Sequence, residues 1–125
     1  MKLKTLIICS TLLFTNIAFA GPDHGEHKPM KGGVLATVKD VDYELVANAT
    51  SISLYVRDHG KSVDLSKASA KITLLTGNDK QEVDLQPTAE KLESKGNFKV
   101  SAGTKVVAII NLQGKSATTA RFVLK

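Results

Sequence analysis

Residues 41–56 decide the fold, and they read VDYELVANATSISLYV. Every second position in two runs of this stretch is apolar: Val41, Tyr43, Leu45, Ala47, Ile52, Leu54 and Val56. Because strand side chains alternate between two faces, the pattern predicts two strands, each with one buried and one solvated face. We expect Asp42 and Glu44 to share a solvated face beside lysines, where pairing with Arg57 would be worth little.

The same period continues along the chain and is interrupted by turn signals. Glycine-containing turns stand at residues 58–61, 77–79 and 113–115. About eight short strands separated by such turns are typical of an antiparallel β-sandwich, so we predict an all-β, immunoglobulin-like domain over residues 34–125. A small barrel is the alternative.

Four details of this domain are also predicted. We expect Pro87 to end its strand, because proline has no N–H to donate. We expect Leu92 to pair with residues 98–100. The apolar stretch 105–112 predicts a central strand covered on both faces. Tyr43 and Tyr55 are predicted to pack against each other across neighbouring strands.

The first twenty residues predict an export signal. Lys2 and Lys4 precede an uncharged, mostly apolar run over residues 5–19, and residues 18–20 read Ala-Phe-Ala, a small-residue cleavage pattern. We expect cleavage after Ala20, a mature chain beginning at Gly21, and a periplasmic location without membrane insertion. An uncleaved membrane anchor is the alternative, although the apolar run is short for spanning a bilayer.

Composition excludes several classes of protein. Cleavage would remove Cys9, the only cysteine, so the mature chain would have no disulfide or thiolate ligand. It would also remove Lys2 and Lys4, which lowers the formal net charge from +5 to +3. The remaining lysines alternate with acids and the chain has no tryptophan. This charge pattern is typical of a solvated surface, so we expect no nucleic-acid partner.

Residues 21–33, GPDHGEHKPMKGG, contain most of the candidate metal ligands. Their glycines and prolines predict a flexible N-terminal arm and exclude a helix. His24 and His27 would lie about 10 Å apart in an extended chain, at roughly 3.3 Å per residue, and Gly25 permits a turn between them. Imidazoles together with the thioether of Met30 favour copper over zinc. A solvated linker without a metal is the alternative.

His59 is the fourth candidate ligand. Residues 58–60, Asp-His-Gly, repeat the local sequence of residues 23–25. A polar turn tip is the simpler interpretation, and a third imidazole for the arm is the functional one. No serine lies on a recognisable nucleophile turn and no glycine-rich phosphate loop joins a strand to a helix, so we predict that the protein is not an enzyme.

Several segments carry a family resemblance: residues 32–34 (GGV), 41–46 (VDYELV), 52–61 (ISLYVRDHGK) and 120–124 (ARFVL). Over residues 24–124 the chain resembles small exported proteins of Gram-negative bacteria. It also resembles the periplasmic β-domain of adaptor subunits of heavy-metal efflux pumps of the resistance-nodulation-division type. The resemblance implies a sandwich-like periplasmic domain linked to copper or zinc handling. In such sequences a histidine often precedes the paired glycines, and here Lys31 stands in that position.

These observations lead to two functional hypotheses. The first is a periplasmic metal-binding or metal-transfer accessory protein, with His24, His27, Met30 and His59 as ligands, copper or zinc as the ion, and an envelope metal-efflux complex as the partner. The second is a non-enzymatic periplasmic interaction module without a specific metal site. A hydrolase is a third, weaker interpretation, because no particular serine stands out.

Overall fold

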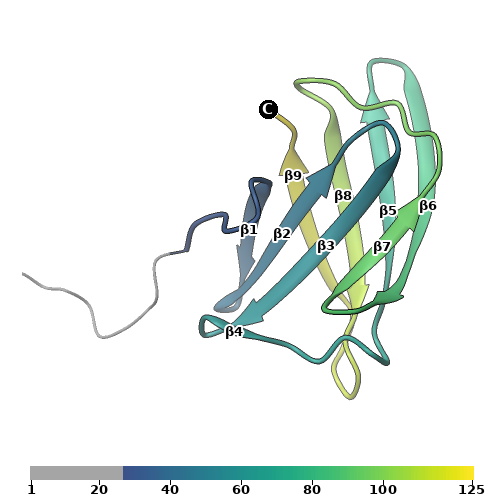
Figure 1. Ribbon diagram of the computed structural model, residues 1–125. Helices are drawn as coiled ribbons and strands as arrows, with labels where there is room; N and C mark the ends of the chain where they lie inside the picture. Colours follow the sequence, from purple (N-terminus) through teal and green to yellow (C-terminus); the bar gives the residue numbers. More distant parts are fainter. Residues whose placement is uncertain (1–26) are drawn as a thin grey trace, which may run out of the picture.

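Nine antiparallel strands form the part of the chain that this computed structural model describes, residues 27–125 (Figure 1). The all-β, antiparallel class is therefore confirmed. Residues 27–125 contain no helix, and so none that is long and apolar enough to cross a membrane. The strands are β1 (Val34–Val38), β2 (Val41–Ala47), β3 (Ser51–Asp58), β4 (Lys61–Ser62), β5 (Ser69–Thr76), β6 (Asp79–Thr88), β7 (Lys91–Lys95), β8 (Lys105–Asn111) and β9 (Thr118–Val123).

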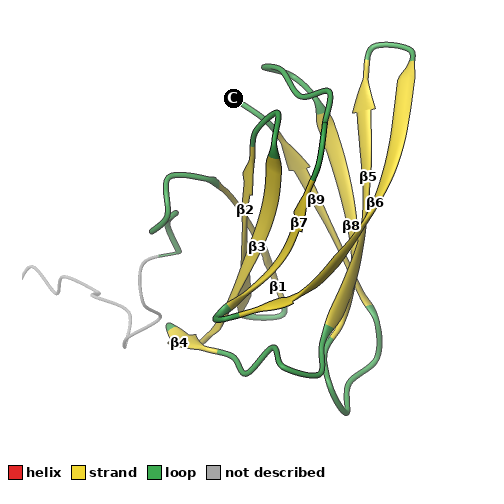
Figure 2. Cartoon of the chain, turned by 45° about the vertical axis from the view of Figure 1, so that its right-hand side comes forward, coloured by secondary structure: helices red, strands yellow, loops and turns green. Residues whose placement is uncertain are grey.

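The strands follow one another around a strongly curved sheet in the order β1-β2-β3-β7-β6-β5-β8-β9, with the short β4 beside β3. The long β6 joins the two halves, because residues 79–85 pair with β5 and residues 86–88 pair with β7. Figure 2 shows β2, β3 and β7 on one side and β5 and β8 on the other. The end strands β1 and β9 contact each other, so the sheet nearly closes on itself.

The core fills the interior of this curved sheet. The period-two pattern read from residues 41–56 is confirmed, since Tyr43, Leu45, Ile52 and Leu54 are at most 2% exposed. Matching apolar positions from the other half complete the core: Ala70, Ile72, Leu74, Val83, Leu85, Val106, Ala108, Ile110, Ala120 and Phe122. Alternation along each strand therefore decides which face of the sheet is buried.

Two predictions about individual strands need correction. β8 is central, between β5 and β9, but it is not covered on both faces, because Ile109 is 43% exposed and only alternate residues are buried. Pro87 does not end β6, since it pairs with Leu92 of β7. At that position β6 has left β5 and has a single paired neighbour, which is an edge-like position that tolerates the missing N–H.

Two predicted pairings are also wrong. Residues 98–100 form no strand, and the Phe98 amide donates instead to the Ala49 carbonyl in the β2–β3 turn. Tyr43 and Tyr55 do not pack together. Tyr43 lies opposite Val56 and points into the core, whereas Tyr55 lies opposite Glu44 on the outer face.

The predicted signal peptide, 1–20, and residues 21–26 of the predicted arm lie outside the described residues. The described remainder of the arm, residues 27–33, has no regular secondary structure and lies against the outer face of β2 and β3. The prediction that the arm is flexible is not confirmed.

Replacing Leu54 by Ala tests the core. Leu54 is fully buried on β3 between β2 and β7, so the cavity left by the change should lower the free energy of unfolding by about 2–5 kcal/mol. Urea unfolding followed by circular dichroism measures this. The matched control is Leu75→Ala, at a position that is 38% exposed, which should cost about 0.5 kcal/mol or less. Equal losses would contradict the assigned core.

Candidate functional site

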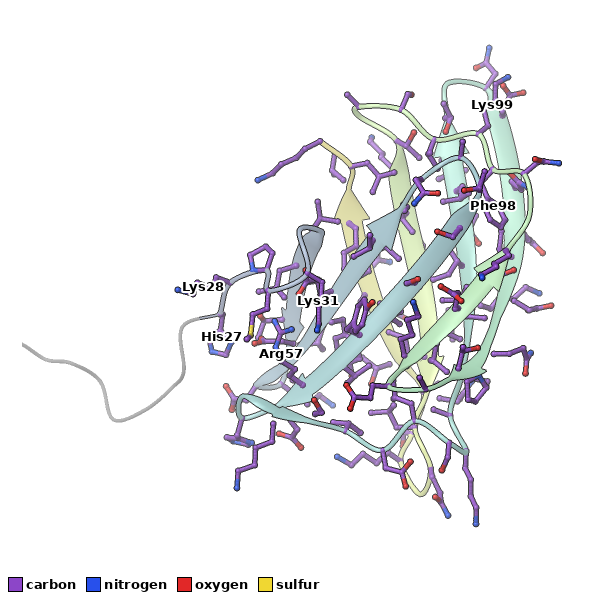
Figure 3. The ribbon with its side chains drawn as sticks, viewed as in Figure 1. His27, Lys28, Lys31, Arg57, Phe98 and Lys99 are labelled. Atoms are coloured by element: carbon purple, nitrogen blue, oxygen red, sulfur yellow. The ribbon has the colours of Figure 1, made fainter. Side chains whose placement is uncertain are left out.

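The outer face of β2 and β3 carries a buried polar cluster, which was not expected from the sequence. Strand alternation places Asp42 and Glu44 of β2 on this face, and Arg57 comes from β3 opposite Asp42. The three residues are only 5%, 0% and 8% exposed, so the prediction that the acids are solvated is wrong. Residues 27–33 cover these three side chains and shield them from solvent. Figure 3 shows Arg57 beside the segment that contains His27 and Lys28.

Glu44 is the centre of this cluster. Its two carboxylate oxygens accept hydrogen bonds from the backbone amides of Met30 at 2.8 Å, Lys31 at 2.6 Å and Gly33 at 3.0 Å. Oε1 also accepts from Nη1 of Arg57 at 3.1 Å. One buried side chain thus holds three amides of a segment without secondary structure, and we call this arrangement the Glu44 clasp.

Arg57 completes the clasp from the neighbouring strand. Its Nη2 donates to the Lys28 carbonyl at 3.0 Å, while its Nη1 pairs with Glu44. The planar guanidinium therefore bridges a carboxylate and a backbone carbonyl, a geometry that a lysine could not reproduce. Within residues 27–125, no buried side-chain nitrogen or oxygen lacks a hydrogen-bond partner.

Burial raises the pKa of Glu44, but the amide bonds from Met30, Gly33 and Lys31 and the bond from Arg57 together outweigh it and leave the pKa below 4.5. These donors all favour the ionised carboxylate. A buried charge is tolerated here because every oxygen has donors, and the same charge would be costly without them.

The paired glycines let the backbone come this close. Gly32 has a φ of +78°, a conformation that other residues rarely adopt. A Cβ on Gly33 would lie 2.2 Å from the carbonyl oxygen of Leu45, which leaves no room for any other residue. The two glycines thus have a structural role: they place the Lys31 and Gly33 amides over Glu44 at the start of β1.

His27 is anchored at the edge of the same cluster. Its Nδ1 lies 2.6 Å from Oδ1 of the buried Asp42, and Thr37 Oγ1 donates to the same oxygen at 2.7 Å. The His27 side chain is 37% exposed, whereas that of Asp42 is 6% exposed. In the neutral tautomer that donates through Nδ1, the lone pair of the ring lies on Nε2. A carboxylate behind the imidazole is the usual support of a metal-ligating histidine.

The other predicted ligands lie in different surroundings. Met30 is 67% exposed and lines a cavity of about 140 Å³ together with Gly60. His59 bonds through Nδ1 to Asp58 and lines a separate cavity at the end of the sheet. His24 lies outside the described residues. Within residues 27–125 there is no group of three or more His, Cys, Asp or Glu side chains that could hold a metal ion.

Lys31 stands where the resembling efflux-adaptor sequences often have a histidine, and its side chain contacts an aromatic ring. Its Nζ lies 5.4 Å from the centre of the Tyr55 ring, and Nζ of Lys91 lies 5.9 Å from the same ring. Both distances are within the range of a cation–π contact. The backbone of Lys31 joins the Glu44 clasp and its side chain covers Tyr55.

Comparison with known proteins adds little to this site. No protein-family model matches the chain, and no curated protein matches its sequence. A solved structure described as "Crystal structure of Br derivative BhCBM56" superposes with a TM-score of 0.42 at 11% identity. The superposition covers 73% of this chain and 99% of the other. A likeness this distant carries no argument about function.

Substituting Glu44 by Gln tests the clasp. An amide in place of the carboxylate cannot accept from all four donors and leaves Arg57 as an unpaired buried charge, so we expect a loss of about 3–5 kcal/mol in the free energy of unfolding. The control is Glu82→Gln, whose side chain is 49% exposed beside Lys71 and Lys80, with an expected loss of about 0.5 kcal/mol or less. Similar losses in both variants, measured by urea unfolding, would contradict the clasp.

The wild type and Glu44→Gln should also differ in how their stability depends on pH, with a definite sign. Because folding lowers the pKa of Glu44, its contribution is fully present above the unfolded value of 4.5 and is lost as the pH falls through the folded pKa. The free energy of unfolding of the wild type should therefore fall more steeply below pH 4.5 than that of Glu44→Gln. Two other acids also have lowered pKa values: Asp64 accepts from the Ser66 amide, and Glu93 pairs with Lys91. Their effect on the pH dependence of stability is the same in both proteins. Parallel curves would be the contradicting result.

Proposed function

We propose that this protein is a periplasmic metal-binding or metal-transfer accessory protein, exported by a signal that is cleaved after Ala20. Copper is favoured over zinc as the ion. The proposed ligands are His24, His27 and Met30 of the N-terminal segment, with His59 as a fourth. The observation that supports the proposal best is the anchored imidazole of His27 on the buried Asp42.

The chemistry of this arrangement suits a metal ligand. Asp42 is held by Thr37 as well as by His27, so its carboxylate is positioned before any ion arrives. Such a carboxylate fixes the tautomer and the ring orientation of a metal-ligating histidine. The exposed thioether of Met30, three residues on, is a soft donor of the kind that Cu(I) prefers. The Glu44 clasp fixes the backbone of Met30 against β2, which limits the positions that its sulfur can take.

The proposed partner is an envelope metal-efflux complex, and this part of the proposal rests on the sequence resemblance. The proposed immunoglobulin-like sandwich rests on the resemblance and on the pattern of turns and strands. In this proposal the protein takes up an ion through the N-terminal segment and passes it to another envelope protein. The partial exposure of His27 and the exposure of Met30 are what such a transfer requires.

Metal titration tests the proposal. The wild type should bind Cu(I), Cu(II) or Zn(II) more tightly than a variant with His24 and His27 replaced by Ala, measured by competition with a chelating indicator. Asp42→Asn should weaken binding by about 10- to 100-fold, because it removes the carboxylate that orients His27. The control is Asp40→Asn in the neighbouring exposed turn, which should bind as the wild type does. Equal affinity of the wild type and the double histidine variant would overturn the proposal, and His59→Ala tests the fourth ligand separately.

A second candidate, the non-enzymatic interaction module, is favoured by one surface. Three of the four large hydrophobic residues that are exposed within residues 27–125 are Leu75, Ile109 and Val123. They come from β5, β8 and β9, and the pairing of Leu75 with Lys105 and of Lys105 with Val123 places them on one outer face. Apolar residues exposed on the same outer face could form part of a docking surface. This function predicts no specific metal affinity and a partner that is retained in the presence of a chelator.

A further inference from the structure

A cavity of about 420 Å³ opens at one end of the sheet, away from the Glu44 clasp. The β1–β2 turn, the start of the β3–β4 turn and the β8–β9 connection surround it. Its floor is apolar, with the buried side chains of Val41, Tyr43 and Leu112. Small-molecule sites have volumes of about 300–1,000 Å³ and combine an apolar lining with a few polar groups, so this cavity has the size and the lining of one.

The rim of the cavity has two lysines and one acid, a formal excess of one positive charge. Lys39, His59 and Lys115 contribute nitrogens, and Asp58 is the single acid. Asp58 bonds to Nδ1 of His59, and its Oδ2 lies 3.8 Å from Nζ of Lys115, so this acid offsets part of the charge of Lys115. Within residues 27–125 Lys39 makes no ion pair, so its charge is available to a ligand. An anionic group is what this set of side chains would attract.

The backbone conformation of Lys39 also supports a ligand site in this cavity. Lys39 and Asp40 form a two-residue hairpin turn with φ angles of +52° and +66°. Asn-Gly is the pair that favours such a turn, and a lysine in its first position costs conformational energy. Residues kept in unfavourable conformations often serve a site. Lys39 lines the cavity together with Val41 from the same hairpin.

We propose that this cavity binds a small organic carboxylate with a short aliphatic body. The body lies on the floor formed by Val41, Tyr43 and Leu112, and the carboxylate lies at the rim with Lys39 and Lys115. Charge-assisted hydrogen bonds from the lysines provide orientation, and burial of the body provides most of the affinity. The site uses neither His27 nor Met30, and it shares only the cavity-lining His59 with the proposed metal ligands.

Amide chemical-shift titration of the labelled protein tests this, with hexanoate as the probe. Hexanoate should give saturable shifts in residues 38–43, 58–60 and 112–118, and it should bind about tenfold more tightly than hexylamine, which has the same body with the opposite charge. The absence of saturable shifts, or equal binding of hexanoate and hexylamine, would overturn the proposal.

Variants locate the anion. Lys39→Gln and Lys115→Gln should each weaken hexanoate binding about fivefold to tenfold, because each removes one charged donor. Lys67→Gln is the control, an exposed lysine in the β4–β5 connection that lines no part of this cavity, and it should bind hexanoate as the wild type does. Unchanged resonances in β3 and β5 show that each variant is folded. If both rim variants bind hexanoate like the wild type, the site is not the one proposed.

Discussion

A single buried carboxylate organises the outer face of this protein. Glu44 has no exposed surface, yet it lies on the side of β2 that faces away from the core. It can stay there only because three backbone amides and one guanidinium surround it, and three of those four donors come from residues 30–33. A buried charge without such donors would destabilise the fold. The clasp therefore couples the N-terminal segment to the sheet, and through that coupling it fixes where Met30 lies and supports the position of His27.

Much of the fold could be predicted from the sequence, because period-two alternation reports directly on burial. Residues 41–56 read as two half-buried strands, and they are neighbours with the predicted face inward. Two of the errors arose where alternation gives no information. Residues 98–100 look like a strand but bond to a turn, and Pro87 lies in the part of β6 that has changed partners. Which strands pair is a property of the whole sheet, so a local pattern could not predict it.

The site was harder to predict, for a physical reason. Asp42 and Glu44 occupy outward positions, and outward acids are normally solvated. Their burial depends on a segment without secondary structure that folds back over them, and such a contact has no periodicity. The paired glycines were the available signal, since neighbouring glycines at the start of a strand indicate a close approach of the backbone. Gly33 against Leu45 is that approach. His27 and Met30 stand in one segment of the sequence, but nothing in the sequence indicated that Asp42 would bond to the imidazole.

The two proposed sites use the sheet differently. The metal proposal depends on the outer face of β2 and the clasped segment, whereas the carboxylate site depends on turns at the end of the sheet. The clasp is the central claim, and native-state hydrogen exchange of the Met30, Lys31 and Gly33 amides tests it most directly. We predict that these amides are protected in the wild type and lose their protection in Glu44→Gln, while amides in the centres of β3 and β8 stay protected. Exchange of the three amides at the rate of an unfolded chain in the wild type would contradict the account.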